Sequence, residues 1–168
     1  MDIVNDNSII SVKRMKPKII YFLIVAFCFF LQTKKSLAEI LPNDKFSSSD
    51  VVEFQLNSLQ ANLKDNRGIY QCWIFAHPEN KKYTGPFENF AKMIQNKPYN
   101  VLLNSKFFKL KVLLENEKEA RIEVILDSIN KKRYKIYWSL GKANLNSKCK
   151  NCWMTLAVTQ PYKIGTIY

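Results

Sequence analysis

The feature that most constrains the fold is a change in the spacing of apolar residues near residue 107. Before this point the apolar residues recur at helical spacing, and after it they alternate with polar residues. Alternation is typical of a strand with one buried face. Four such runs follow one another: 107–114, 120–126, 134–140 and 152–158. Short polar connections join the first three runs, so the pattern predicts antiparallel hairpins.

The segment before the strands predicts helices. Ser47 to Asp50 indicates a helix start, because Asp50 and Glu53 have the spacing of a capping box. Asn66-Arg67-Gly68 is expected to end this helix. Three further segments are predicted: a helix over 69–75 that Pro78 ends, a helix that Thr84 caps and Pro86 opens, and a short turn or helix at 99–103.

Helices followed by strands are the order of an α+β domain, in which helices pack on one face of an antiparallel sheet. The chain has 168 residues, enough for one domain of about 100–150 residues. We place this domain at 47–160, after a linker at 39–46 and before a tail at 161–168. Between 141 and 151 the sequence is polar, and we expect a loop.

The first 38 residues have the pattern of a signal peptide. A basic stretch at 13–18 precedes an apolar run of 13 residues, Ile19 to Leu31. This length fits a signal-peptide core and is short for a membrane span, which needs roughly 20 residues. Ser36-Leu37-Ala38 offers a cleavage site before Glu39, and Met15 offers an alternative start.

Lys34 and Lys35 lie between the apolar run and this cleavage site. A basic pair there disfavours cleavage, so the alternative is a membrane anchor formed by residues 19–31. With cleavage, the protein is exported to the periplasm, the cell exterior or a thylakoid lumen.

The net charge is +12, and the residues after position 38 carry 20 basic and 12 acidic side chains, or +8. A basic surface favours anionic partners. The lysines are scattered, as on an ordinary solvated surface. The basic run at 131–135 could contact nucleic acid, but export disfavours such a partner.

Three cysteines follow the proposed cleavage site, and Cys149 and Cys152 have CxxC spacing. They could form a disulfide, remain free thiols, or supply half of a metal site with Cys72 and His77. A thioredoxin-type role is disfavoured, because Cys152 leads directly into a strand. We predict neither a metal nor a cofactor.

A motif covers the central part of the chain: Phe75-Ala76-x-Pro78-x-Asn80-Lys81, then Thr84-Gly85-Pro86-x-x-x-Phe90-Ala91-x-Met93, then Tyr99-x-x-Leu102-Leu103. Together with Cys152-Trp153-Met154-Thr155, it resembles the uncharacterised family called domain of unknown function 4864, over roughly residues 47–158. The chain departs from that pattern at His77, where a small residue is expected, and at Lys81, where arginine is usual. The resemblance implies a cone-shaped α+β fold similar to nuclear transport factor 2, and it implies no activity.

Two groups of residues are candidates for a site. One group is aromatic and would line a pocket between helices and sheet, or simply form core: Tyr70, Trp73, Tyr134, Trp138 and Trp153. The other group is the turn of the family motif: His77, Pro78, Asn80, Thr84, Gly85, Pro86 and Phe90. Its polar members could instead cap helices, and Gly85 would serve a backbone conformation that other residues resist.

These observations predict an exported binding or interaction module with a hydrophobic pocket. Its partner would be a small apolar ligand or a protein that meets the sheet. The alternatives are a pocket enzyme of isomerase or dehydratase type and a membrane-tethered accessory subunit. The enzyme would need His77, Asp65 or Glu88 to point into the pocket. The sequence has no phosphate-binding glycine loop or nucleophile elbow, and we predict no catalytic residue.

Overall fold

The computed structural model describes residues 39–62, 64–145 and 149–167. Both interpretations of residues 1–38, a signal peptide or an anchor at 19–31, lie outside the described residues. None of the helices in the described part of the chain has the length and apolar content that a membrane crossing requires.

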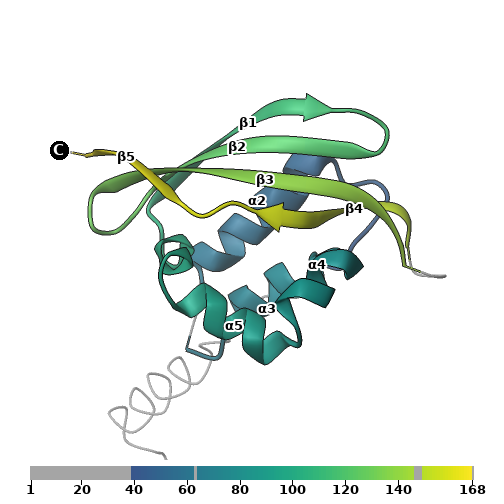
Figure 1. Ribbon diagram of the computed structural model, residues 1–168, viewed down its shortest axis with the longest axis horizontal. Helices are drawn as coiled ribbons and strands as arrows, with labels where there is room; N and C mark the ends of the chain where they lie inside the picture. Colours follow the sequence, from purple (N-terminus) through teal and green to yellow (C-terminus); the bar gives the residue numbers. More distant parts are fainter. Residues whose placement is uncertain (1–38, 63, 146–148, 168) are drawn as a thin grey trace, which may run out of the picture. The chain divides into compact units, whose positions relative to one another are not determined.

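The domain has two layers, a sheet and a set of helices that covers one of its faces (Figure 1). The helical elements come first: α2 (Ser48–Gln60), α3 (Arg67–Ile74), α4 (Pro78–Thr84), α5 (Phe87–Gln95) and the 3₁₀ helix η1 (Tyr99–Leu102). The strands follow: β1 (Phe107–Glu115), β2 (Glu119–Asp127), β3 (Lys132–Leu145), β4 (Cys149–Val158) and β5 (Tyr162–Thr166). The predicted α+β class is therefore confirmed.

The described strands form one antiparallel sheet in the order β1-β2-β3-β4. β5 also pairs with β3, along Lys132–Lys135, so β4 and β5 share the same long neighbour. The sheet thus has five strands where the sequence predicted about four. The segment 161–168, predicted to be a tail, contains β5. Its strand is five residues long and includes Gly165, which made it inconspicuous in the sequence.

The core lies between the sheet and the helices. Alternate residues of β2 and β3 are almost fully buried, as their spacing predicted: Ala120, Ile122, Val124, Leu126, Ile136, Trp138 and Leu140. They meet apolar residues from the helices, among them Val52, Leu56 and Leu59 of α2 and Ile69 of α3. Burial of these side chains is the main favourable contribution to folding.

Two details at the start of the helical layer differ from the prediction. The capping box of α2 is formed by Ser47 and Asp50, one turn before the predicted pair. The prediction also ended this helix at Asn66 to Gly68, but these residues begin α3. A Cβ at Gly68 would collide with the carbonyl oxygen of Ser58, so this glycine permits the close approach of α2 and α3.

The linker at 39–46 contains no helix or strand. It is nevertheless attached to the domain near its beginning. The backbone N–H of Ile40 donates to Gln71 Oε1 over 2.9 Å, and Gln71 Nε2 donates to the Ile40 carbonyl over 2.6 Å.

The central motif forms α4, which the sequence did not predict. Pro78 begins this helix at its first position, where its missing N–H costs nothing, and His77 is the N-cap. Thr84 is the last residue of α4, whereas Pro86 occupies the N-cap of α5. Gly85 joins the two helices at φ 75° and ψ −160°, so it has the unusual backbone conformation that we expected.

The expected loop at 141–151 is shorter than predicted, because β3 continues to Leu145 and β4 starts at Cys149. Farther along, Leu140 pairs with Thr155 but Ser139 pairs with Ala157. Leu156 is therefore the extra residue of a β-bulge in β4.

β1 is an edge strand that pairs only with β2 among the described strands. Val112, Leu113 and Leu114 are each more than two-fifths exposed. Lys109 and Lys111 precede them in the strand, and the register with β2 shifts between Val112 and Leu114.

Replacement of Gly85 by alanine tests the role of this junction. We expect Gly85→Ala to lower the free energy of unfolding by about 1–3 kcal/mol, because a Cβ strongly disfavours this backbone region. Gly165→Ala is the matched control, since a Cβ there has no neighbour within 4 Å and its φ is ordinary. Urea denaturation would compare the two variants, and equal stabilities would contradict the assignment.

Candidate functional site

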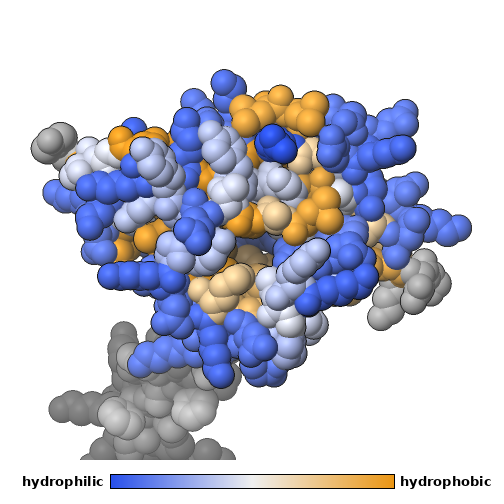
Figure 2. Space-filling view, viewed as in Figure 1, coloured by the Kyte–Doolittle hydropathy of each residue, from blue (hydrophilic) through white to orange (hydrophobic). Residues whose placement is uncertain are grey.

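A cavity of about 320 Å³ lies between β4 and the helices α4, α5 and η1. Figure 2 shows a hollow between the sheet and the helices, with hydrophobic surface beside it. Apolar side chains from α5, η1 and β4 form much of its wall, including Phe90, Met93, Ile94, Leu102 and Val158. The cavity is at the small end of the range typical of small-molecule sites.

The bulge in β4 determines which strand residues face this cavity. Leu140 and Trp138 both lie on the buried face of β3, and they pair with Thr155 and Val158 of β4. The extra residue, Leu156, lets both of these β4 residues face the helices although they are three positions apart. Bulges commonly redirect side chains in this way beside functional sites.

Gln55 of α2 is 4% exposed and forms the polar centre of the cavity's inner end. Its Nε2 donates to the carbonyl of Cys72 over 3.1 Å, which fixes the orientation of the amide. Its Oε1 then accepts from Trp138 Nε1 over 3.2 Å and from Thr155 Oγ1 over 2.8 Å. Both lone pairs of Oε1 are therefore occupied.

Thr155 connects the sheet edge to three helical elements. Its N–H donates to the Phe75 carbonyl over 2.8 Å, at the end of α3. Its carbonyl accepts from the His77 N–H over 2.9 Å and from Asn80 Nδ2 over 3.1 Å. These bonds hold the α3–α4 junction against β4 and leave the edge strand paired at this point.

Two further hydroxyl groups line the cavity and donate to backbone carbonyls. Tyr99 Oη donates to Val158 O over 3.2 Å, and Thr84 Oγ1 donates to Asn80 O over 3.1 Å. Burial raises the pKa of Tyr99, so this phenol stays protonated at neutral pH. Tyr83, at 91% exposed, also contributes to the lining.

The lining residues among the described part of the chain include no Asp, Glu, Lys, Arg or His. The ionisable groups that remain are the two tyrosines and Cys72. Burial raises the pKa of the Cys72 thiol well above its ordinary value, and its Sγ contacts the Gln55 carbonyl at 3.4 Å. A thiol held protonated in this way is a poor nucleophile.

The structure separates the five predicted pocket aromatics. Trp138 lines the cavity, whereas Tyr70, Trp73, Tyr134 and Trp153 do not. Tyr70 and Trp73 pack with Phe87 in a cluster between α3 and α5, with ring centroids 5.3–6.1 Å apart. Aromatic rings gain more from such mutual edge and stacked contacts than from lining an open space.

Each of the remaining tryptophans has a lysine ammonium 4.1 Å from a ring centroid. Lys81 lies over Trp73 and Lys142 lies over Trp153. Burial lowers the pKa of Lys81. Trp153 is part of the main core, and Tyr134 packs at its margin.

The motif turn supplies one side of the cavity. Asn80, Thr84 and Phe90 are lining residues. The other residues of the motif turn have structural roles. His77 caps α4, because its Nδ1 accepts from the Glu79 N–H over 3.1 Å. Pro78, Gly85 and Pro86 lie at the ends of α4 and α5.

The residues that an enzyme would have needed do not line the cavity. The His77 side chain caps α4, and Glu88 is exposed to solvent. Asp65 is also exposed, and a hydrogen bond from Arg67 lowers the pKa of its carboxyl group. None of these groups is placed to exchange a proton with a molecule in the cavity.

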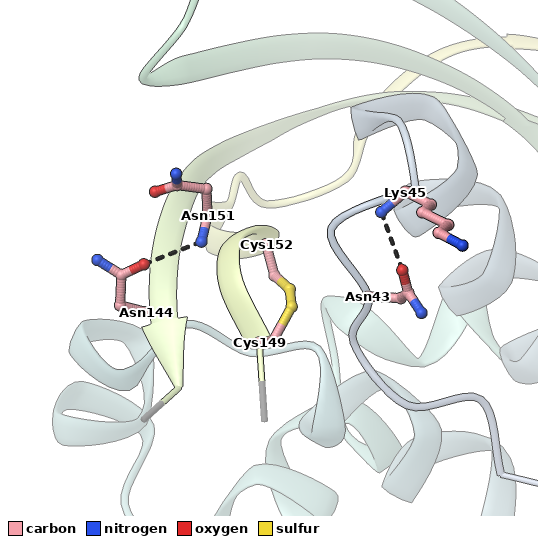
Figure 3. Close-up of a disulfide and its surroundings, with 6 residues drawn as sticks. All are labelled: Asn43, Lys45, Asn144, Cys149, Asn151 and Cys152. Carbon is pink, nitrogen blue, oxygen red and sulfur yellow. Dashed lines mark hydrogen bonds between the residues drawn. A yellow bond between two sulfur atoms is a disulfide. The ribbon is translucent and has the colours of Figure 1, made fainter. Parts of the chain in front are cut away.

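Cys149 and Cys152 form a disulfide near the start of β4 (Figure 3). Both are buried in a small separate cluster with Ala143 and Met154. The N–H of Asn151 donates to Asn144 Oδ1 over 2.9 Å beside this disulfide. Within the described residues, no group of three or more His, Cys, Asp or Glu side chains is arranged to hold a metal ion.

Taken together, the geometry defines an uncharged cavity that could hold a small molecule. In comparisons with known proteins, no family model matches the chain, and neither a curated protein nor a solved structure is significantly similar to it. The resemblance to domain of unknown function 4864 therefore remains a prediction.

The role of Gln55 can be tested with an isosteric apolar substitution. Gln55→Leu leaves the Trp138 N–H, the Thr155 hydroxyl and the Cys72 carbonyl without their partner. Each buried unsatisfied group costs about 1–3 kcal/mol, so we expect a loss of roughly 3 kcal/mol or more in urea denaturation. Gln95→Leu on the exposed face of α5 is the control, and an equal effect of both changes would contradict this role.

Alkylation tests the disulfide. In denaturant without reductant, we expect iodoacetamide to modify Cys72 but not Cys149 or Cys152, because a disulfide sulfur is not nucleophilic. Reduction should make all three reactive. Peptide mass spectrometry would locate the labels, and labelling at 149 or 152 before reduction would refute the disulfide.

Proposed function

We propose that the domain is a binding module for a small, uncharged and predominantly apolar molecule, held in the cavity between β4 and the helices. The main observation in support is the chemistry of the lining, which combines apolar walls with polar groups that are hydrogen-bonded within the protein. Among the residues that the structure describes, the lining has no charged side chain. Phosphates, nucleotides and metal complexes need a charged or ligating group, and the cavity offers none to them.

This proposal is favoured over an enzyme of isomerase or dehydratase type. Such an enzyme needs an acid or base within hydrogen-bond reach of the substrate. His77, Asp65 and Glu88 lie elsewhere, and the Cys72 thiol is kept protonated by burial. A binding role requires only the cavity and its bonded polar groups.

We also propose that the fold is of the nuclear transport factor 2-like, cone-shaped kind, as the family resemblance implies. The order of helices before strands supports this, as does the position of the cavity between the two layers. Export is proposed from the N-terminal sequence pattern, and the Cys149–Cys152 disulfide is compatible with an oxidising compartment. A tethered accessory subunit would follow if residues 19–31 were retained.

A neutral fluorescent probe can test the binding module. We expect N-phenyl-1-naphthylamine to bind the domain with enhanced emission, because the cavity removes its rings from water. Val158→Phe places a larger side chain into the cavity and should weaken probe binding by about tenfold or more. Val112→Phe, the same substitution at an exposed position of β1, is the matched control.

Emission that does not rise with the wild-type protein would contradict the proposal. So would binding that Val158→Phe and Val112→Phe affect equally. Circular dichroism of both variants would establish that the fold is retained.

A further inference from the structure

The hydroxyl groups of the cavity lining donate their protons to partners within the protein. The direction of these hydrogen bonds determines which ligands the cavity can still bind. This selection rests on the proposed binding function and depends on the hydrogen-bonding groups that the lining leaves free for a ligand. A hydroxyl group has one proton and two lone pairs, so a hydroxyl that already donates can only accept.

The direction of each bond is fixed by its partner. Carbonyl oxygens only accept, so Tyr99 must donate to Val158 O and Thr84 must donate to Asn80 O. The Cys72 carbonyl requires Nε2 of Gln55 on its side, which turns Oε1 towards Thr155. Thr155 therefore must donate as well.

The same reasoning orients Asn80. Its Nδ2 faces the Thr155 carbonyl, so the other atom of the amide end is the acceptor Oδ1. The indole N–H of Trp138 is already bound to Gln55. The remaining side-chain donors of the buried lining are one amide N–H on each of Gln55 and Asn80, whereas lone pairs remain on the side chains of Thr84, Tyr99, Thr155 and Asn80.

We propose that the cavity selects uncharged, mainly apolar molecules that carry a hydroxyl or N–H donor. Such a ligand can donate to the hydroxyl oxygens of Thr84, Tyr99 or Thr155, which no ether, ester or carboxylate can do. A carboxylate is further disfavoured because the lining has no cation to offset its desolvation.

A water molecule that enters the cavity can donate to these lone pairs. A guest without a donor replaces that water and leaves the acceptors unpaired, at a cost that a hydroxyl avoids. Discrimination therefore comes from the polar end of the ligand, while affinity comes from its apolar body.

Displacement of N-phenyl-1-naphthylamine by three naphthalenes tests this selection. 2-Naphthol is an uncharged donor, 2-methoxynaphthalene is an uncharged acceptor, and 2-naphthoate is an anion of similar size. We expect 2-naphthol to bind about three- to tenfold more tightly than the ether, the factor that one net hydrogen bond supplies. We expect 2-naphthoate to bind more weakly than both.

Two variants locate the acceptors. Thr84→Val and Tyr99→Phe each remove a hydroxyl and leave the Gln55 bonds intact, and in the double variant the preference for 2-naphthol should fall, because only Thr155 and Asn80 remain as side-chain acceptors in the described lining. Tyr137→Phe is the control, because that hydroxyl lies near Glu123 and outside the cavity lining. A preference that is unchanged in the double variant would overturn the assignment of Thr84 and Tyr99.

The outcomes separate the two proposals. If N-phenyl-1-naphthylamine itself does not bind, the binding function fails. If it binds and the ether or the carboxylate matches or exceeds 2-naphthol, the binding function stands and the donor selection is wrong.

Discussion

The amide of Gln55 is the constraint on which the two layers of this domain depend. It lies within the apolar stripe of α2, and its three bonds reach α3, β3 and β4. Burial of an amide costs free energy unless its N–H and C=O groups are hydrogen-bonded. These three bonds therefore permit essentially one position of α2 against the sheet. Thr155 then carries the constraint outward to the α3–α4 junction.

The cavity exists because these bonds hold one part of the helical layer more closely than the other. α2 packs against the sheet, and Gly68 allows α3 to approach α2 closely. α4 has no buried residue, and it is attached chiefly through the Thr155 carbonyl, which accepts from the Asn80 side chain and the His77 N–H. Hydrogen bonds therefore close the ends of the space between α4, α5 and the bulged part of β4. The middle of this space is the cavity.

Much of the fold was predictable from the sequence, because the alternation in β2 and β3 and the apolar stripe of α2 each have one physical meaning. The site was harder to predict. Tyr70 and Trp73 were expected to line the cavity, but they pack on each other and on Phe87 instead. The signal that was missed was Gln55, a polar residue between Val52 and Leu56 whose burial required partners that no single sequence reveals.

The free edge of β1 has a consequence for how copies of this protein meet in solution. A sheet edge can be extended by another chain only while the backbone groups stay in step. The shift between Val112 and Leu114 interrupts the backbone pattern beside three exposed apolar residues of the strand, and Lys109 and Lys111 add like charges to any approaching copy. The protein should therefore resist association through this edge at high concentration in low salt. Added salt should weaken that protection, because it screens the charges of the lysines.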